Sequence, residues 1–330
     1  MTTVLVAGAG EVGIRTARQL LDTEAVDRVL VGSRRLARAR EVCAALHDGA
    51  EPVELGPGVI PESVDSVAAA VPGSAVEGLA RAAIAAGVPF AAAADHESAT
   101  SALCGLDAAA RAAGVPVIAG CGLAPGLSDV LAVHAAAALD RVDEVHVARF
   151  GIAGPASLAT ARRALEEPAL EWRDGALVHD KHAGPELDWF PEPVGGRECR
   201  PVSSGVELLV ATLPGLRDAT SRLGLPSLRR FPPTRRDPGA ALGAVRVEVW
   251  GWDDGTRAPL VYGALEQTAI AVGTVLGVTT AWLAGALPAL GDRPHPGATG
   301  LGRVVTPVPF LAELARRGLK AAVFEGAPVG

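Results

Sequence analysis

The sequence predicts an α/β protein with a doubly wound parallel sheet and a second α+β domain, and three observations lead to this fold class. Short apolar runs alternate with helix-like segments from Thr3 to Ala119, which is typical of a parallel sheet with helices on both faces. A Gly-x-Gly-x-x-Gly motif follows the first apolar run without a gap. After Asp143, apolar and polar residues alternate over residues 144–149 and again, strictly, over 245–250, which indicates a mixed or antiparallel sheet.

The first apolar run and the glycine motif begin a βαβ unit. Residues 3–7 form the expected first strand, an amphipathic helix follows the glycines, and residues 28–32 form the second strand. Gly8 is expected to permit a tight turn, Gly10 to let the backbone approach a pyrophosphate, and Gly13 to let the helix pack closely. The first helical turn offers free N–H groups and a positive dipole end to phosphates. The motif therefore predicts a Rossmann-type dinucleotide site with Gly8, Gly10, Glu11, Val12 and Gly13.

The end of the second strand predicts which dinucleotide is bound. An NAD site usually carries an acidic residue about 20 residues past the glycines, which binds the ribose 2′-OH. Here that position is Ser33, and Arg34 and Arg35 follow it. A hydroxyl and a guanidinium can bind a 2′-phosphate, whereas a carboxylate would repel it. The alternative is that both arginines only face solvent, but the missing acid favours NADP(H) over NAD(H).

Further alternating segments complete the predicted sheet. Helices are expected over residues 36–46, 73–86 and 97–113, and strands over 52–55, 66–71, 88–90 with the alanines after it, and 115–119. Ligands of such sheets bind beyond the carboxyl ends of the strands. Three loops, 71–73, 95–97 and 120–122, should therefore surround one crevice. Val71, Pro72 and Gly122 are accordingly predicted to contact the cofactor.

The second half of the chain is predicted to form a substrate domain. A strand is expected through residues 144–149, a helix over 157–167, and loops and hairpins from 170 to 240. After these, the sequence predicts a hairpin that turns at residues 253–256, a long uncharged helix from Thr268, and a last helix and strand over 309–324. We therefore divide the chain into an NADP-binding domain (1–125), a substrate and dimerisation domain (126–300), and a C-terminal helix and strand (301–330) that can return to the first domain.

The composition of the chain argues against several classes of partner and binding site. The chain has 330 residues, 49% of them hydrophobic, and its net charge of −7 argues against a nucleic-acid partner. Its four cysteines are scattered, so neither a disulfide framework nor a metal site is expected. The N-terminus enters a strand at once, which predicts a cytoplasmic protein. The uncharged stretch from Thr268 to Leu290 contains Gly273-x-x-x-Gly277, but its threonines and glycines favour a buried helix over a membrane-spanning one.

Several kinds of catalytic site are excluded by the sequence. Tyr262 is the only tyrosine, and Glu266 stands four residues after it. A Tyr-x-x-x-Lys pair of the short-chain dehydrogenase type is therefore absent. The sequence also lacks a Cys/His pair for zinc-dependent alcohol oxidation and a Gly-x-Ser-x-Gly nucleophile elbow.

The most distinctive stretch, residues 118–129, reads Ile-Ala-Gly-Cys-Gly-Leu-Ala-Pro-Gly-Leu-Ser-Asp, with Pro125 at an expected helix start. It resembles the Cys/Val-Gly-x-x-Pro-Gly-x-Ser/Thr-Asn stretch of the saccharopine dehydrogenase family, which includes lysine 6-dehydrogenase and carboxynorspermidine dehydrogenase. The likeness includes the N-terminal glycines and residues 82–90, covers the first 150 residues well, and is loose beyond them. It implies a nicotinamide-dependent oxidoreductase that reduces an imine or oxidises an amine in a small amine or amino-acid-derived substrate.

The sequence departs from this family at two places. Asp129 stands where relatives often have Asn, and the loop after Phe90 reads four alanines and then Asp-His-Glu where the family usually has Tyr-Val-Asp. Catalysis by a lysine is also hard to accommodate, because Lys181 falls in an expected loop and Lys320 lies near the C-terminus. The substrate is therefore expected to differ from saccharopine.

The loop at residues 95–97 supplies the first catalytic candidates. Hydride transfer to an imine or carbonyl needs a nearby proton, and His titrates near working pH. His96 is the expected donor, with Asp95 or Glu97 able to orient its ring. The alternative is a helix cap, with Asp95 as the N-cap and His96 and Glu97 in the first turn. Both roles can hold together.

The remaining candidates lie on either side of the expected domain junction. Asp129 can pair with a substrate ammonium or stabilise the N-terminal turn of its own helix. Arg149 can hold a substrate carboxylate or form an interdomain ion pair. The motif also places Ser128, Pro125 and Cys121 near the substrate. Cys121 has no evident base beside it and is treated as a small apolar residue.

The favoured function is that of an NADP(H)-dependent oxidoreductase acting on a C–N bond. The same fold could reduce C=O or C=C, because the hydride comes from the cofactor and the same acid can serve. A third possibility is a non-catalytic or non-redox protein that retains the fold, since function resides in sites. The expected partners are a small-molecule substrate and a second copy of the chain in a homodimer.

Overall fold

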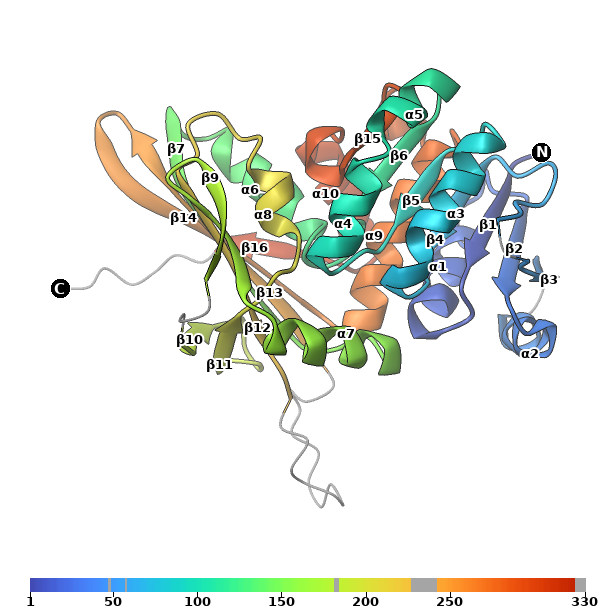
Figure 1. Cartoon of the computed structure of the whole chain (residues 1–330), viewed down its shortest axis with the longest axis horizontal. Helices are drawn as coiled ribbons and strands as arrows, with labels where there is room; N and C mark the ends of the chain where they lie inside the picture. Colours follow the sequence, from blue (N-terminus) through green and yellow to red (C-terminus); the bar gives the residue numbers. More distant parts are fainter. Residues whose placement is uncertain (47–48, 57, 181–183, 227–241, 324–330) are drawn as a thin grey trace, which may run out of the picture.

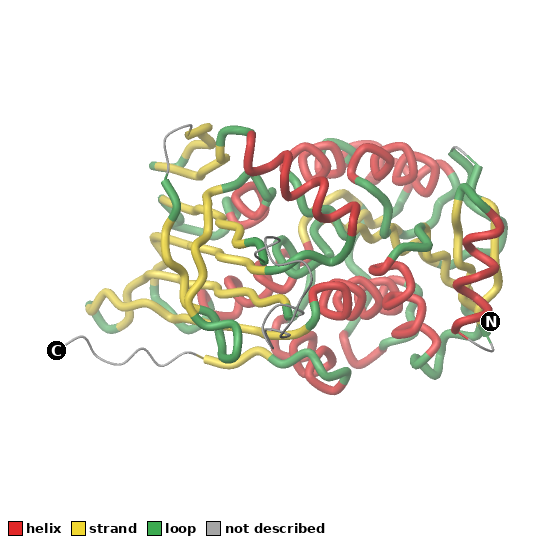
Figure 2. The backbone as a smooth tube through the Cα atoms, turned by 90° about the horizontal axis from the view of Figure 1, so that it is seen from below, coloured by secondary structure: helices red, strands yellow, loops and turns green. Residues whose placement is uncertain are grey.

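The computed structural model describes residues 1–46, 49–56, 58–180, 184–226 and 242–323. It contains two β-sheets that lie side by side (Figure 1). Seen from below, the strands form two separate groups with helices between and around them (Figure 2). The predicted fold class, a doubly wound parallel sheet with a second mixed domain, is confirmed.

All strand pairs of the first sheet are parallel. Its order is β15-β6-β5-β4-β1-β2-β3. The four strands β1, β4, β5 and β6 are buried along their whole length, as expected for a sheet covered on both faces. The bounds are β1 Thr3–Ala7, β2 Arg28–Ser33, β3 Ala50–Glu54, β4 Ser66–Ala69, β5 Phe90–Ala92, β6 Pro116–Ala119 and β15 Gly297–Gly300.

Helices cover both faces of this sheet because successive strand residues point to opposite sides. Val4 and Val6 of β1 join a core with α1 (Glu11–Leu21), α2 (Leu36–Leu46) and α9 (Thr268–Leu283). Leu5 and Ala7 join the opposite core, with α3 (Gly73–Ala85), α4 (Glu97–Cys104) and α5 (Asp107–Ala113).

The prediction of one helix over residues 97–113 is wrong. Two helices, α4 and α5, occupy this segment, with Gly105 as the C-cap of the first and Leu106 as the N-cap of the second. Glycine has a low helix propensity, and Leu106 is buried at 3% exposure. The chain therefore breaks where a buried leucine anchors the turn between the two helices.

The second sheet is mixed, with order β10-β11-β12-β7-β13-β14-β16 and with β8 paired to both β12 and β9. β12 and β7 are parallel, and the other pairs are antiparallel. The predicted hairpin is confirmed, because Asp253 pairs with Thr256 across a two-residue turn. The bounds are β7 Arg141–Phe150, β8 Ala169–Arg173, β9 Ala176–Asp180, β10 Glu186–Trp189, β11 Gly196–Pro201, β12 Asp218–Gly224, β13 Gly243–Asp253, β14 Thr256–Glu266 and β16 Ala321–Val323.

Three helices accompany this sheet: α6 (Leu127–Ala136), α7 (Pro155–Glu166) and α8 (Val206–Val210). The segment predicted as loops and hairpins from 170 to 240 contains the antiparallel pairs β8–β9 and β10–β11, and in addition β12 and the short helix α8. The predicted loop position of Lys181, residues 227–241 and the end of the last predicted strand lie outside the described residues.

The C-terminal part of the chain returns to the first sheet and then to the second. Helix α9 packs against α1, β4 and β5, and β15 pairs with β6. Helix α10 (Pro307–Arg316) packs against α6 and α9, and β16 then pairs with β14. Both α9 and β15 lie within the range 126–300 that was predicted as the second domain. The domain boundaries themselves stay a prediction.

The two glycines of the uncharged segment form the seam between α9 and α1. A Cβ at Gly273 would lie 2.4 Å from Arg15 Cβ, and a Cβ at Gly277 would lie 2.9 Å from Gln19 Cβ. The motif thus lets two helices approach closely within the core. In the described part of the chain, no helix combines the length and the apolar character needed to cross a membrane.

This seam gives a test of the packing. We expect Gly273→Ala to destabilise the protein by about 1–3 kcal/mol, because the added methyl overpacks the α1–α9 contact. The control is Gly78→Ala at an exposed position of helix α3, where a Cβ meets nothing within 4 Å. That change should stabilise the protein by about 0.5–1 kcal/mol. Urea unfolding measures both, and equal effects of the two changes would contradict the packing assignment.

Candidate functional site

Two cavities lie beyond the carboxyl ends of the parallel strands, one on each side of the glycine motif. The first has a volume of about 630 Å³ and is lined by Ala9, Gly10, Glu11, Ser33, Arg34, Arg35, Arg38 and Pro155. The second has a volume of about 110 Å³ and includes Val12, Val71, Pro72, Gly122, Asp95 and Arg149 in its lining. The two cavities are adjacent, because Glu11 lines the first and the next residue, Val12, lines the second. We refer to the two cavities together as the groove.

The three glycines of the motif have the geometry that a dinucleotide site requires. Gly8 has φ of +122°, and a Cβ there would lie 2.2 Å from the carbonyl oxygen of Ala70. A Cβ at Gly13 would lie 1.8 Å from the carbonyl oxygen of Gly8, so α1 packs directly on the turn. At Gly10 a Cβ would meet nothing within 4 Å, so the backbone faces open space. No side chain caps α1, which leaves its N-terminus free for an anion.

The end of the groove near β2 is cationic. Arg34 and Arg35 are exposed and make no ion pair within the described chain. The Ser33 hydroxyl accepts a hydrogen bond from the Arg35 N–H at 3.2 Å, which leaves the hydroxyl proton free to be donated. Arg38 lies at the same end, and its Nε donates to the Ala9 carbonyl at 3.2 Å. This end of the groove suits a phosphate.

The other end of the groove contains a buried arginine. Arg149, at the end of β7, is 7% exposed. Its Nη1 lies 3.6 Å from Asp95 Oδ2, whereas Nε and Nη2 have no hydrogen-bond partner among the described residues. A buried guanidinium with unpaired donors is costly unless a ligand satisfies them. Nε and Nη2 form one edge of the guanidinium, and their two N–H groups have the spacing to bind both oxygens of a carboxylate.

Of the loop 95–97, only Asp95 reaches the groove. His96 is 5% exposed, and its Nε2 lies 3.0 Å from Glu167 Oε2. His96, and not Asp95, is the N-cap of α4, because its side chain accepts from the Ser98 N–H. The expectation of Asp95 as the cap is wrong by one residue, since Asp95 is engaged by Arg149. The catalytic role of His96 stays a prediction, and its ring does not line the groove.

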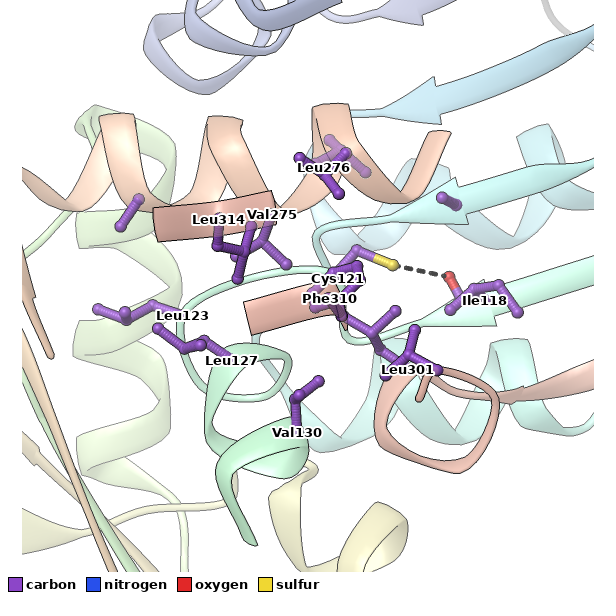
Figure 3. Close-up of a cluster of buried hydrophobic side chains, with 14 of the residues drawn as sticks. Ile118, Cys121, Leu123, Leu127, Val130, Val275, Leu276, Leu301, Phe310 and Leu314 are labelled. Carbon is purple, nitrogen blue, oxygen red and sulfur yellow. Dashed lines mark hydrogen bonds between the residues drawn. The ribbon is translucent and has the colours of Figure 1, made fainter. Parts of the chain in front are cut away.

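Three residues of the distinctive stretch lie below the groove, in the core. Cys121 is fully buried and its thiol donates to the Ile118 carbonyl (Figure 3). Burial raises the pKa of this thiol to about 12. Pro125 and Ser128 are also buried and are absent from the lining of both cavities. The structure therefore does not bring these predicted substrate contacts to the groove. Helix α6 begins at Leu127, after Pro125, because its N-cap Gly126 has φ of 134°.

Asp129 is buried beneath the same turn. Its Oδ2 accepts from the Gly126 N–H at 3.1 Å, and its Oδ1 accepts from the Ser128 hydroxyl at 3.0 Å. Burial raises the pKa of this carboxyl to about 8, and the Glu207 carboxyl contributes in the same direction. Of the two predicted roles, this geometry matches the stabilisation of the first turn of α6. A protonated Asp129 also has the shape of the Asn that the resembling family often carries.

Sequence reasoning missed several residues of the groove. Arg38 lies in the first turn of α2, four residues after Arg34, and this closeness to the Arg34-Arg35 pair in the sequence could have identified it. The start of α7 contributes Pro155 to the first cavity and Ala156, Ser157 and Thr160 to the second. No motif marks these residues, because only the approach of the second sheet brings them to the groove.

Asp129 gives a pH-dependent prediction. The pKa of its carboxyl is raised on folding, so its contribution to the free energy of unfolding is fully present below about pH 4. That contribution is lost as the pH rises toward about 8. We expect Asp129→Asn to fold and to lose less stability than the wild type between pH 5 and pH 8, by urea unfolding.

The control for this experiment is Asp292→Asn, which removes an exposed carboxyl and should leave the pH profile unchanged. A profile of Asp129→Asn as steep as that of the wild type would show that the buried carboxyl is not the source of the slope. Glu207 retains its own contribution in both proteins, because burial raises the pKa of its carboxyl to about 7.

Comparisons with known proteins extend the description of the fold. No family model matches the sequence, and no curated protein matches it either. Apo saccharopine dehydrogenase (L-Glu forming) from Saccharomyces cerevisiae is similar in structure, with a TM-score of 0.66 at 13% identity over 98% of this chain and 100% of that chain. A meso-dapdh mutant with DAP from Clostridium tetani has a TM-score of 0.52 at 13% identity, over 99% and 98% of the two chains.

A probable dehydrogenase from Thermotoga maritima has a TM-score of 0.50 at 11% identity, over 97% of this chain and 98% of that chain. Nearly the whole of each chain is covered, so the likeness includes both sheets. At these identities the comparisons establish the fold, a Rossmann-type domain joined to a second mixed-sheet domain.

Proposed function

We propose that this protein is an NADP(H)-dependent oxidoreductase that transfers hydride at the C–N bond of a small substrate with a carboxylate. One observation carries the proposal: the groove has cations without ion-pair partners at one end, a buried arginine with unpaired donors at the other, and the glycine motif between them. That order matches the adenosine phosphate, the pyrophosphate and the reacting end of a dinucleotide with its substrate. The similar structures support the proposal, since two of them are named dehydrogenases.

The residues of the groove fit the cofactor. Ser33, Arg34 and Arg35 would hold the 2′-phosphate, while the first turn of α1 would hold the pyrophosphate. Val12, Val71 and Pro72 offer apolar contacts at the second cavity, where the nicotinamide ring would lie. When bound, the cofactor supplies or accepts the hydride.

Arg149 and Asp95 provide opposite charges for the substrate. The unpaired Nε and Nη2 of Arg149 are buried in this structure, and they would bind a carboxylate through two hydrogen bonds once the guanidinium turns toward the cavity. The Asp95 carboxylate lines the same cavity and would pair with the positive nitrogen of an iminium or ammonium group. The two side chains lie 3.6 Å apart, which suits a substrate that carries both charges on neighbouring atoms.

The lining of the second cavity favours a C–N bond over a carbonyl. Among the described residues of this lining, the titratable groups are Asp95 and Arg149. Carbonyl reduction requires a proton donor at the developing alkoxide. An iminium nitrogen already carries its proton and needs only a counter-charge, which Asp95 would supply.

The cofactor assignment predicts a difference between two nucleotides. We expect the wild type to bind NADPH at least tenfold more tightly than NADH in calorimetric titration, about 1.4 kcal/mol. Arg34→Ala and Arg35→Ala should each reduce this preference, because each removes a cation from the 2′-phosphate site. Arg40→Ala removes an exposed arginine of the following helix, α2, that does not line the groove, and it should leave the preference intact. Equal binding of NADPH and NADH by the wild type would refute NADP(H) specificity.

The substrate assignment predicts a carboxylate-dependent effect. With NADPH present, Arg149→Gln should lower kcat/KM for 2-imino acids by about 10- to 100-fold, corresponding to the 1.5–3 kcal/mol of a charge-assisted hydrogen bond. The corresponding carboxamides should be affected little, since they lack the charge. Arg162→Gln, an exposed position on α7, serves as the control. An equal loss for acids and amides would argue against carboxylate binding by Arg149.

A further inference from the structure

The segment that begins at Asp95 is bound to the second sheet domain at four points. Asp95 contacts Arg149, and the Glu97 N–H donates to the Ser203 carbonyl at 3.2 Å. Glu97 Oε2 also lies 3.4 Å from His179 Nε2. The fourth contact, between His96 and Glu167, differs from the others because it reaches the end of helix α7.

The proton on His96 is located by its neighbours. The Ser98 backbone N–H can only donate, and it lies 3.2 Å from His96 Nδ1. Nδ1 therefore accepts, and the proton of the neutral ring is on Nε2. Nε2–H donates to Glu167 Oε2 at 3.0 Å. The ring thus uses one nitrogen to cap α4 and the other to bind Glu167.

Helix α7 depends on polar contacts at its C-terminal end. Its only buried side chains are Ala161 and Ala164, so it buries little apolar surface. No side chain caps its N-terminus at Gly154. Glu167 is the C-cap, its N–H donates to the Arg163 carbonyl, and its Oε1 lies 3.7 Å from Arg163 Nε. The bond to His96 therefore joins the end of a weakly packed helix to the first domain.

The other end of α7 covers the groove. Pro155 lines the first cavity, and Ala156, Ser157 and Thr160 line the second. A Cβ at Gly154 would lie 3.3 Å from Glu11 Cγ, so the start of α7 contacts the start of α1. In Figure 1, α7 extends from the second sheet toward the helices of the first. A shift of α7 would therefore change both cavities at once.

We infer that Glu167, acting through His96, is a positioning residue that holds helix α7 over the groove. What the groove binds rests on the proposed function, whereas the hold on α7 does not. On this assignment His96 acts at a distance from the substrate. Loss of the bond should loosen α7 and weaken nucleotide binding, and the hydride-transfer step should be affected much less.

The variants separate this role from helix capping. Glu167→Ala removes the acceptor, and Glu167→Gln retains one. His96→Asn preserves an N-cap, because Asn is a strong capping residue, but its shorter side chain cannot reach Glu167. Glu166→Ala is the matched control: it removes a neighbouring exposed carboxylate of the same helix that contacts no charged partner within the described chain.

Hydrogen–deuterium exchange of the nucleotide-free protein tests the hold on α7 directly. Amides of residues 158–166 should exchange about tenfold faster in Glu167→Ala and in His96→Asn, as expected for loss of a charge-assisted hydrogen bond. The double variant should add little, because both changes remove one interaction. Glu167→Gln should recover much of the protection, and Glu166→Ala should match the wild type. Unchanged exchange of α7 in Glu167→Ala would overturn the inference.

Calorimetry and kinetics test the consequence for the groove. Glu167→Ala and His96→Asn should weaken NADPH binding about tenfold and raise the KM for NADPH, with kcat changed less than twofold. A large fall in kcat of His96→Asn at unchanged NADPH affinity would instead identify a catalytic His96 and overturn the positioning role. If the wild type binds neither nucleotide, the proposed function fails, and the exchange experiment still decides whether Glu167 holds α7.

Discussion

The close approach of backbones around helix α1 is the constraint on which the rest of the structure depends. On one side, Gly13 leaves room for the Gly8 carbonyl, so that α1 begins directly beneath the groove. On another side, Gly273 and Gly277 let α9 lie against Arg15 and Gln19. Any larger side chain at these positions would move α1 away from β1 or from α9. The helix that would bind the pyrophosphate is thus fixed by residues that have no side chain.

The second sheet completes the groove by supplying the charges and the cover that the first sheet lacks. Strand β7 ends at Arg149 beside Asp95, and the chain then turns into α7, which reaches both cavities. The glycine motif alone would bind a dinucleotide without selecting a substrate. The buried guanidinium, which the sheet holds at 7% exposure, would give this end of the groove a preference for an anion. On the proposed function, cofactor binding and substrate selection would therefore come from different sheets, which meet at residues 95–97.

The sequence predicted most of the first sheet, because its strands and helices are local patterns with clear ends. It also predicted the tight turn at Gly8, the close packing at Gly13 and the 253–256 hairpin. The split between α4 and α5 was missed, since it depends on where Leu106 is buried. The burial of Cys121, Ser128 and Asp129 in the core could not be predicted either. A glycine turn followed by polar residues has the same sequence pattern whether its side chains line a groove or are buried beneath it. The His96–Glu167 contact joins residues far apart in the chain, and no local sequence pattern predicts it.

The central claim is that one groove holds a whole nicotinamide dinucleotide, with the adenosine end near Arg34 and the nicotinamide near Asp95. Saturation-transfer difference NMR of NADP⁺ with the wild-type protein tests this most directly. The account predicts transfer to the adenine and nicotinamide protons alike, because both rings would lie against protons of the protein. Transfer to the adenine protons alone, or to neither ring, would contradict it.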